Sequence, residues 1–140
     1  MSVSEEYASV EIDTILPILV LPPPISRTTL ALFGGASGDH NPIHLDIDMA
    51  KSAGLDDAFA QGMLSMAYLG RLLTNWVPQD RIRTFNVRFA AITPVLAQPT
   101  AQGQVTEITE HDGERLATLE VAVTLADGTV TLAGTAVVAL

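Results

Sequence analysis

The sequence contains no cysteine and few basic residues. Its 140 residues include seven lysines and arginines against sixteen aspartates and glutamates, a formal net charge of −9. The absence of cysteine excludes disulfide bonds and any chemistry that needs a thiolate. The shortage of positive charge argues against nucleic acid or an anionic membrane surface as a partner, because both are bound through clustered lysines and arginines. A polyanionic substrate would need a local positive patch.

Long hydrophobic runs are also missing. The run ILPILVLPPPI, at residues 15–25, is short and interrupted by prolines, so no membrane-spanning segment is expected. Pro22–Pro24 should end whatever element residues 15–20 begin. The first thirteen residues lack the basic and then apolar pattern of an export signal, which makes a cytoplasmic protein the expectation.

Length and hydrophobic content indicate how the chain is organised. The length predicts one domain over residues 1–140 with a single buried core. Hydrophobic residues make up 48% of the chain, which is high for a lone small domain. We therefore expect a further face to be buried against a partner chain.

The pattern divides the chain into a helical half and a β-rich half. Ser26 can cap a helix that Gly34 and Gly35 would end, and residues 46–54 predict a short helix closed by a glycine. Residues 58–77 predict the clearest helix, which is apolar almost all round and should be buried inside a sheet. The order predicts an α+β fold, an antiparallel sheet wrapped around one long central helix. Two Asp-Gly turns help to define the strands, which are expected at residues 82–92, 100–109, 114–126 and 129–140.

The densest polar stretch is SGDHNPIHLD, residues 37–46, which holds two of the three histidines. Pro42 should turn this segment so that Asp39 and His44 converge on one side. Near neutral pH a carboxylate is charged and an imidazole exchanges its proton readily, so the two can orient a water, take its proton and return a proton to carbon. Reversible hydration of a double bond requires these steps. The alternative is ordinary helix capping by the aspartates and solvated histidines.

The string Asp-x-Asn-Pro-x-His at residues 39–44 resembles the hydratase motif of the MaoC-like, (R)-specific enoyl-thioester hydratases. The resemblance continues in residues 54–77, which look like the central helix of that family, and in residues 84–95, which look like the strand that follows. Within the family, the chain is most similar to the B subunits of mycobacterial (3R)-hydroxyacyl-acyl-carrier-protein dehydratases. The resemblance implies a single MaoC-like hot-dog domain.

The resemblance also implies roles for individual residues. Asp39 and His44 would hold and activate the water, and the backbone N–H of Gly62 would bind the thioester oxygen as charge develops on it. Asn41 and Gln61 are further candidates for substrate binding. A glycine at a helix N-terminus suits an oxyanion on physical grounds as well. Close packing of the helix against the sheet explains Gly62 equally well.

Two positions depart from the family pattern. Gln61 stands where the family usually has histidine, so a proton-carrying role at this position is lost. Gly70 stands where some relatives have a serine that assists the site, so that role does not transfer. Ser65 has no Gly-x-Ser-x-Gly elbow around it and is expected to pack in the core and not to act as a nucleophile.

Three of the seven basic residues, Arg81, Arg83 and Arg88, lie within eight positions. In an acidic chain they are candidates to bind the phosphates of coenzyme A or of a carrier's phosphopantetheine. Salt bridges to nearby aspartates explain them at least as well: Asp56, Asp57 or Asp80.

These observations favour a carbon–oxygen lyase, an (R)-specific hydratase or dehydratase that interconverts trans-2-enoyl and (3R)-3-hydroxyacyl thioesters. Coenzyme A thioesters are preferred over acyl-carrier-protein thioesters because the chain is acidic. No cofactor is expected beyond the coenzyme A or phosphopantetheine of the substrate. No metal is expected either, because Pro42 disrupts the spacing of His40 and His44 and no cluster completes a coordination shell.

Two other functions are open to a chain with this pattern. It can be a non-catalytic or tunnel-shaping hot-dog subunit of a heteromeric dehydratase. A thioesterase on the same fold is disfavoured, because such enzymes commonly place an acid on the central helix and residues 61–76 contain none. Hot-dog chains normally pair their sheets edge to edge, so a homodimer or heterodimer of such chains is expected.

Overall fold

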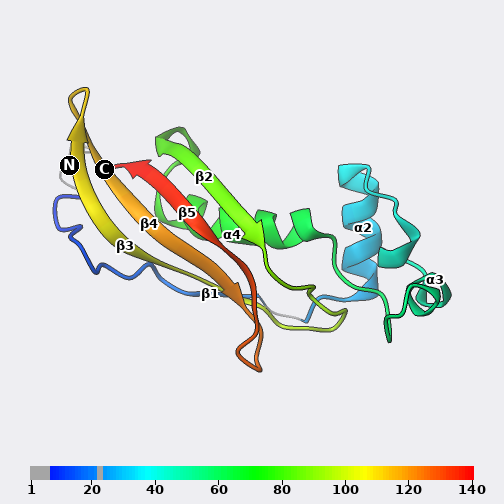
Figure 1. Ribbon diagram of the computed structural model, residues 1–140. Helices are drawn as coiled ribbons and strands as arrows, with labels where there is room; N and C mark the ends of the chain where they lie inside the picture. The colour runs from blue at the N-terminus through cyan, green and yellow to red at the C-terminus, as the bar shows by residue number, and fades with distance from the viewer. Residues whose placement is uncertain (1–6, 22–23) are drawn as a thin grey trace.

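A curved antiparallel sheet wraps one side of a long helix (Figure 1). The computed structural model describes residues 7–21 and 24–140, so Pro22 and Pro23 of the proline triplet lie outside the described residues. The central helix is α4 (Gly62–Trp76), and α2 (Arg27–Ser37) and α3 (Ile47–Ser52) lie beyond its N-terminal end. The predicted α+β arrangement, a sheet around one long helix as in the hot-dog fold, is confirmed.

The strands have the spatial order β1-β3-β4-β5-β2. The predicted antiparallel pairing of the last four strands is confirmed. Strand β2 follows α4 in the sequence but pairs with β5, so it forms one edge of the sheet, and the very short β1 forms the other. The strands are β1 (Leu19–Val20), β2 (Ile82–Phe89), β3 (Thr100–His111), β4 (Glu114–Thr124) and β5 (Val130–Ala139).

Both predicted Asp-Gly turns close hairpins. Asp112 and Gly113 join β3 to β4 with φ angles of 50° and 79°. Positive φ at both central positions matches the right-handed twist of the flanking strands, and Asp-Gly adopts it at low cost. Gly128, with φ of 87°, has the same role between β4 and β5.

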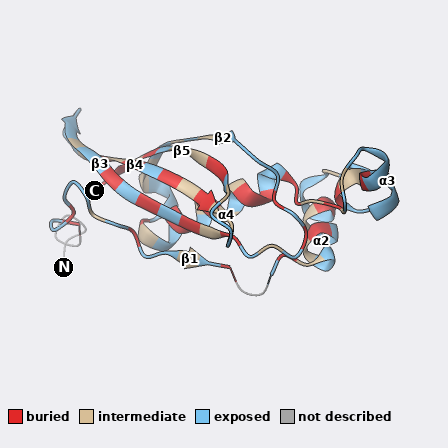
Figure 2. Cartoon of the chain, turned by 60° about the horizontal axis from the view of Figure 1, so that its bottom comes forward, coloured by how far each residue is buried: buried red, intermediate tan, exposed pale blue. Residues whose placement is uncertain are grey.

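The core lies between α4 and the concave face of the sheet. Alternate residues of β4 are buried, and the same alternation along β3 and β4 is visible in Figure 2. From α4, Leu69, Leu72 and Leu73 fill the space opposite these strands. A smaller cluster around Leu30 and Leu64 joins α2 to the first turn of α4.

Helix α4 is buried on one side only. Met63 and Ala67 are exposed, together with Arg71 in the next turn, so the expectation of a helix buried all round is wrong for a single chain. The reason is that one curved sheet covers about half of a helix surface, and nothing in the described part of the chain packs on the other half. Among the described helices, none has both the length and the apolar content needed to cross a bilayer.

Helix α2 extends past the glycines that were expected to end it. The Ser26 side chain caps the helix by accepting from the N–H of Thr29 at 3.1 Å, as predicted. Gly34 and Gly35 remain helical, and the helix ends at Gly38, which adopts a left-handed φ of 80°. Helix α2 therefore reaches the polar motif directly.

The core should respond strongly to the loss of a central leucine. Leu69 has no exposed surface, whereas Leu32 on α2 is 69% exposed. We expect Leu69→Ala to lower the free energy of unfolding by about 2–5 kcal/mol, through lost burial and the cavity left behind. Leu32→Ala should change it by less than about 0.5 kcal/mol. Urea denaturation of both variants measures the difference, and equal effects would contradict the assigned core.

Candidate active site

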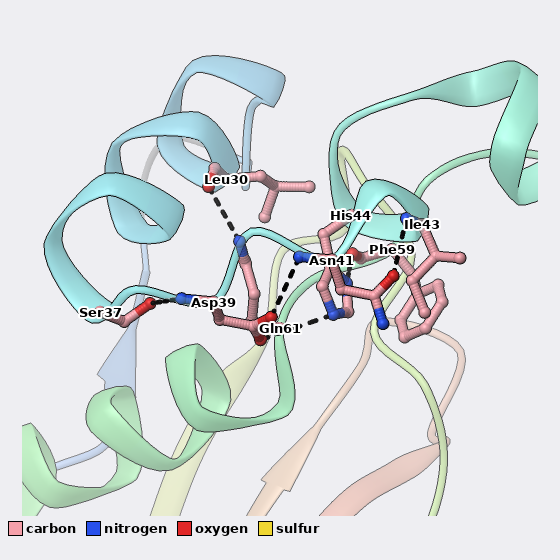
Figure 3. A network of polar contacts seen from close by, with 8 residues as sticks. All are labelled: Leu30, Ser37, Asp39, Asn41, Ile43, His44, Phe59 and Gln61. Atoms are coloured by element: carbon pink, nitrogen blue, oxygen red, sulfur yellow. Dashed lines mark hydrogen bonds and ion pairs between the residues drawn. The ribbon is translucent and has the colours of Figure 1, made fainter.

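The motif loop after α2 is shaped by its own polar side chains (Figure 3). One carboxylate oxygen of Asp39, Oδ1, accepts from the N–H of Asn41 at 3.3 Å. The Asn41 side chain accepts in turn from the N–H of Ile43 at 3.3 Å, and Pro42 begins the short 3₁₀ helix Pro42–His44. Asn41 therefore stabilises the turn, and its part in substrate binding stays a prediction. These bonds place His44 on the same side of the loop as Asp39.

His44 is buried, and its ring is fixed from two directions. Its Nδ1 lies 2.7 Å from the carbonyl oxygen of Phe59, in the segment that leads into α4. A carbonyl only accepts hydrogen bonds, so Nδ1 carries the proton and the neutral ring presents the lone pair of Nε2. The Phe59 ring packs edge-on against the imidazole, with centroids 4.7 Å apart. The ring orientation is therefore set before any ligand binds.

Asp39 and His44 face each other, as Figure 3 shows. The second carboxylate oxygen of Asp39, Oδ2, lies 3.7 Å from Nε2 of His44. This distance is too long for a direct hydrogen bond, but a water placed beside the two atoms would be within hydrogen-bonding range of both. The Asp39 side chain is partly exposed while that of His44 is buried, so the pair opens to solvent on the aspartate side.

Gln61, the residue before the first residue of α4, is completely buried. Its Nε2 donates to the backbone carbonyl of Leu30 in α2 at 2.9 Å. Its Oε1 is the one buried side-chain polar atom without a hydrogen-bond partner among the described residues. The sequence had made Gln61 a candidate for substrate binding. In the structure it connects the start of α4 to α2 and has no exposed surface.

The N-terminus of α4 supplies unpaired N–H groups beside the pair. Helix α4 begins at Gly62, three residues after Phe59, and no side chain caps it. The first N–H groups of a helix have no partner within the helix, and the helix dipole favours negative charge at that end. A Cβ at Gly62 would lie 3.0 Å from the Phe89 ring, so the helix packs closely on the end of β2 at this glycine. The role of Gly62 as an oxyanion donor stays a prediction.

A pocket of about 340 Å³ adjoins the start of α4. Apart from two hydroxyl-bearing residues its walls are apolar. Leu132 of β5, Phe59 and the loop after β2 contribute to it. The lining residues are Phe59, Ala60, Gly62, Ser65, Phe89, Ala90, Ala91, Ile92, Thr93 and Leu132. Its size suits a small acyl group.

Ser65 and Thr93 are the two hydroxyl-bearing residues of this pocket. Ser65 is buried, as expected, but it also lines the pocket, which the sequence did not indicate. The sequence pointed to a place near the site only through spacing. Ser65 follows Gly62 by three residues, and residues three apart lie on the same face of a helix. Thr93 lies in the loop after β2 and carried no recognisable signal.

The structure does not bring Arg81 and Arg83 to the pair. Arg81 ends the short 3₁₀ helix before β2 and Arg83 is near the start of β2, whereas Phe89, which lies against Gly62, is at the other end of the strand. Arg83 forms a two-pronged bond with Glu114, which raises the pKa of Arg83 and lowers the pKa of Glu114. Arg81 donates to the carbonyl of Ala139 at 3.2 Å. Their role in phosphate binding stays a prediction.

Arg88 lies elsewhere, in a groove on the outer face of the sheet. Gln102, Gln104 and Glu120 line the same groove.

Among the aspartates considered as partners for the arginines, Asp57 pairs with Arg27 of α2, and this hydrogen bond lowers the pKa of Asp57 and raises that of Arg27. This exposed pair links α2 to the segment before α4.

A family of known proteins matches most of this chain. The model of the MaoC-like domain matches residues 16–129. The (R)-hydratase from A. caviae involved in PHA biosynthesis is 25% identical, with a TM-score of 0.82 over 94% of this chain and 98% of that one. Among curated proteins, no sequence matches significantly.

Two further solved structures support the same fold. The R-hydratase PhaJ1 from Pseudomonas aeruginosa, in its unliganded form, has a TM-score of 0.81 at 24% identity, covering 95% of this chain and 84% of that one. The ChsH1–ChsH2 complex from Mycobacterium tuberculosis contains a chain with a TM-score of 0.80 at 21% identity, covering 94% of this chain and 98% of that one. At these identities the likeness concerns the fold alone.

The two adjacent glycines of α2 should respond in opposite ways to an added methyl group. A Cβ at Gly34 would lie 3.1 Å from the backbone oxygen of Asp39, whereas a Cβ at Gly35 meets nothing within 4 Å. We expect Gly35→Ala to stabilise the fold by about 0.5–1 kcal/mol, because alanine favours the helix. Gly34→Ala should lose that gain and displace the Asp39 loop. Denaturation curves and the NMR signals of the His44 ring test both effects, and an unchanged His44 environment in Gly34→Ala would contradict the tight contact.

Proposed function

The chain belongs to the MaoC-like domain family of hydratases and dehydratases, and we propose that it is an (R)-specific member acting on acyl thioesters. It would add water to trans-2-enoyl thioesters and, in reverse, dehydrate (3R)-3-hydroxyacyl thioesters. The observation that carries the proposal is the approach of Asp39 Oδ2 to His44 Nε2 next to the uncapped start of α4. The similarity to the (R)-hydratase from A. caviae supports the same reaction class.

Asp39 and His44 would hold the reacting water between two acceptors. An ionised carboxylate and the Nε2 lone pair each accept one hydrogen of the water, which leaves its oxygen lone pairs free to attack C3 of the enoyl group. One of the two acceptors takes a proton as the C3–O bond forms, and a proton is returned to C2 to complete the hydration. Because the two groups interact, they would titrate as a coupled pair.

The Gly62 N–H would stabilise the charge that develops on the thioester oxygen. As water adds to C3, electron density moves through C2 to this oxygen and gives an enolate-like species. A preorganised N–H at a helix N-terminus stabilises such charge without reorganisation. The acyl part would extend into the pocket beside Ser65, and coenzyme A is the carrier that the acidic chain favours.

The reaction should depend on both members of the pair. We expect Asp39→Asn and His44→Gln each to lower kcat/KM for a trans-2-enoyl-CoA by about 10²- to 10⁴-fold, the usual contribution of a positioned acid or base. Loss of the absorbance of the conjugated thioester measures the rate. His40→Gln, at an exposed position of the same loop, is the matched control and should retain activity. Undiminished turnover in both variants of the pair would contradict the proposal.

The chain would act as a dimer of hot-dog chains, joined along the free edge of β2. This edge is eight residues long, and unpaired strand edges readily accept another strand. Exposed apolar side chains lie next to it: Met63, Phe89 and Ile92. The likeness to a chain of the ChsH1–ChsH2 complex is compatible with a second, different chain as the partner. Activity of the lone chain would argue against a merely tunnel-shaping subunit.

Solution mass tests the proposed dimer. We expect the purified chain to sediment with twice its own mass, and Met63→Glu to shift the mass toward the monomer by placing a charge in the apolar contact. Leu32→Glu, at an even more exposed position on α2 and away from β2, is the control and should not change the mass. A wild-type chain that stays monomeric alone and dimerises only with a second hot-dog protein would favour the heteromeric form.

A further inference from the structure

Ser65 and Thr93 place two hydroxyl groups in the wall of an otherwise apolar pocket. The exposed fractions of these residues are only 1% and 3%, and their oxygens lie 3.3 Å apart. The remaining side chains of the pocket are aliphatic or aromatic. Burying a hydroxyl among such groups has a cost, which a hydrogen bond offsets. The pair therefore differs from ordinary core packing in a way that needs an explanation.

Backbone hydrogen bonds fix both hydroxyls in position. Ser65 is on α4, and the segment before α4 is bonded to the loop that carries Thr93. The N–H of Ala60 donates to the carbonyl of Thr93 at 2.8 Å, and the N–H of Val95 donates to the carbonyl of Ala58 at 3.3 Å. Because these bonds do not involve the two side chains, the hydroxyls are held together without having to stabilise the loop themselves.

The pair has one hydrogen-bond donor more than it uses. Each hydroxyl has one proton, and a single bond between them uses one of the two. In the described part of the chain, neither oxygen bonds to any other group. The hydroxyl that accepts this bond thus keeps a proton that it can donate to a ligand in the pocket.

We propose that Ser65 and Thr93 form a polar subsite that binds an oxygen atom on the acyl chain of the substrate. The preferred substrates would be thioesters of oxygen-bearing acyl groups, in which an ether, keto or hydroxyl oxygen accepts the free proton of the pair. This inference rests on the proposed function, because it takes the acyl group to enter this pocket from the thioester bound at Gly62.

The position of the pair limits where that oxygen lies. Ser65 follows Gly62 by three residues of α4, a rise of about 4.5 Å that an extended acyl chain spans in about four bonds. The pocket volume of about 340 Å³ limits the acyl group to a short or medium chain. An oxygen at position 5 or 6 of the chain would therefore meet the pair.

Binding of unreactive thioesters tests the subsite without requiring turnover. The probes are heptanoyl-CoA and two ethers of equal length, in which oxygen replaces carbon 5 or 6. Calorimetry gives the Kd of each probe for the wild-type chain and for the double variant Ser65→Ala/Thr93→Val. For each protein, the Kd of heptanoyl-CoA divided by the Kd of an ether gives the preference for that ether. The measured quotient is the preference of the wild type divided by the preference of the double variant, so the effect of the ether's own polarity on binding cancels.

We expect this quotient to be about five- to tenfold for at least one ether, as one neutral hydrogen bond gives. The double variant replaces both hydroxyls with apolar groups of similar shape, so heptanoyl-CoA should bind it about as well as the wild type. Thr131→Val removes a buried hydroxyl that bonds to the Val123 carbonyl and does not line the pocket, so it should leave the preference unchanged. Ser65→Ala alone replaces the double variant if the latter does not fold.

The outcomes separate the subsite from the proposed reaction. Quotients within twofold of one for both ethers, or no binding of any probe, would overturn the subsite. A uniform loss of affinity for all three probes in the double variant would also overturn it, and would place the pair at the thioester oxygen. Turnover of trans-2-heptenoyl-CoA is measured separately: a quotient above fivefold without turnover would sustain the subsite and contradict the hydratase.

Discussion

The hydrogen bond between the His44 ring and the Phe59 carbonyl holds the candidate site together. It joins the loop after α2 to the segment that becomes α4, fifteen residues further along the chain. At 2.7 Å it fixes which ring nitrogen carries the proton, and so it directs the lone pair of Nε2 toward Asp39. Since Phe59 is three residues before Gly62, the same bond sets the distance from the pair to the N–H groups of α4. It therefore ties the Asp39–His44 pair directly to the segment that leads into the N-terminus of α4.

A second connection keeps the same two segments in register. Gly34 lets the Asp39 backbone pack directly on α2, and the Gln61 amide reaches the Leu30 carbonyl close beside it. This arrangement leaves Oε1 of Gln61 buried without a partner, which costs about 1–3 kcal/mol. A neutral amide tolerates complete burial better than a group that takes up a proton. The replacement of the family's usual histidine by Gln61 is thus compatible with a structural role at this position.

Local signals predicted the elements that local chemistry determines. The Asp-Gly turns and the cap at Ser26 follow from the preferences of a few neighbouring residues, whereas α4 begins at Gly62, four residues later than the apolar spacing predicted. The predicted end of α2 was wrong because a pair of glycines in a sequence is typical of a helix end. Here Gly34 stays in the helix and packs against the Asp39 backbone, a tertiary contact that the local sequence does not show. Local patterns also could not predict that β2 pairs with β5, or which residues the arginine side chains bind. Arg83 pairs with a residue 31 positions away, on β4.

The Asp39–His44 pair was predictable because both residues lie within six consecutive positions, whereas the Ser65–Thr93 pair joins residues 28 positions apart. Apolar spacing placed Ser65 on a buried helix face but gave no information on what lay opposite. Thr93 reaches it only because the loop after β2 bonds to residues 58–60. Pairs of this kind depend on the register between two segments, which a single sequence does not specify.

The open side of α4 connects assembly to chemistry. Gly62 and Met63 are exposed, and the rim of the pocket is formed by Phe89 and Ile92, which are both about half exposed. Electrostatic stabilisation of an enolate-like oxygen by an N–H group is far weaker in water than in a low-dielectric site. In a single chain, the Gly62 N–H therefore faces solvent that would weaken its effect. An apolar partner surface along β2 and α4 would exclude that water. The exposed apolar residues that a partner would cover therefore lie beside the proposed reaction site.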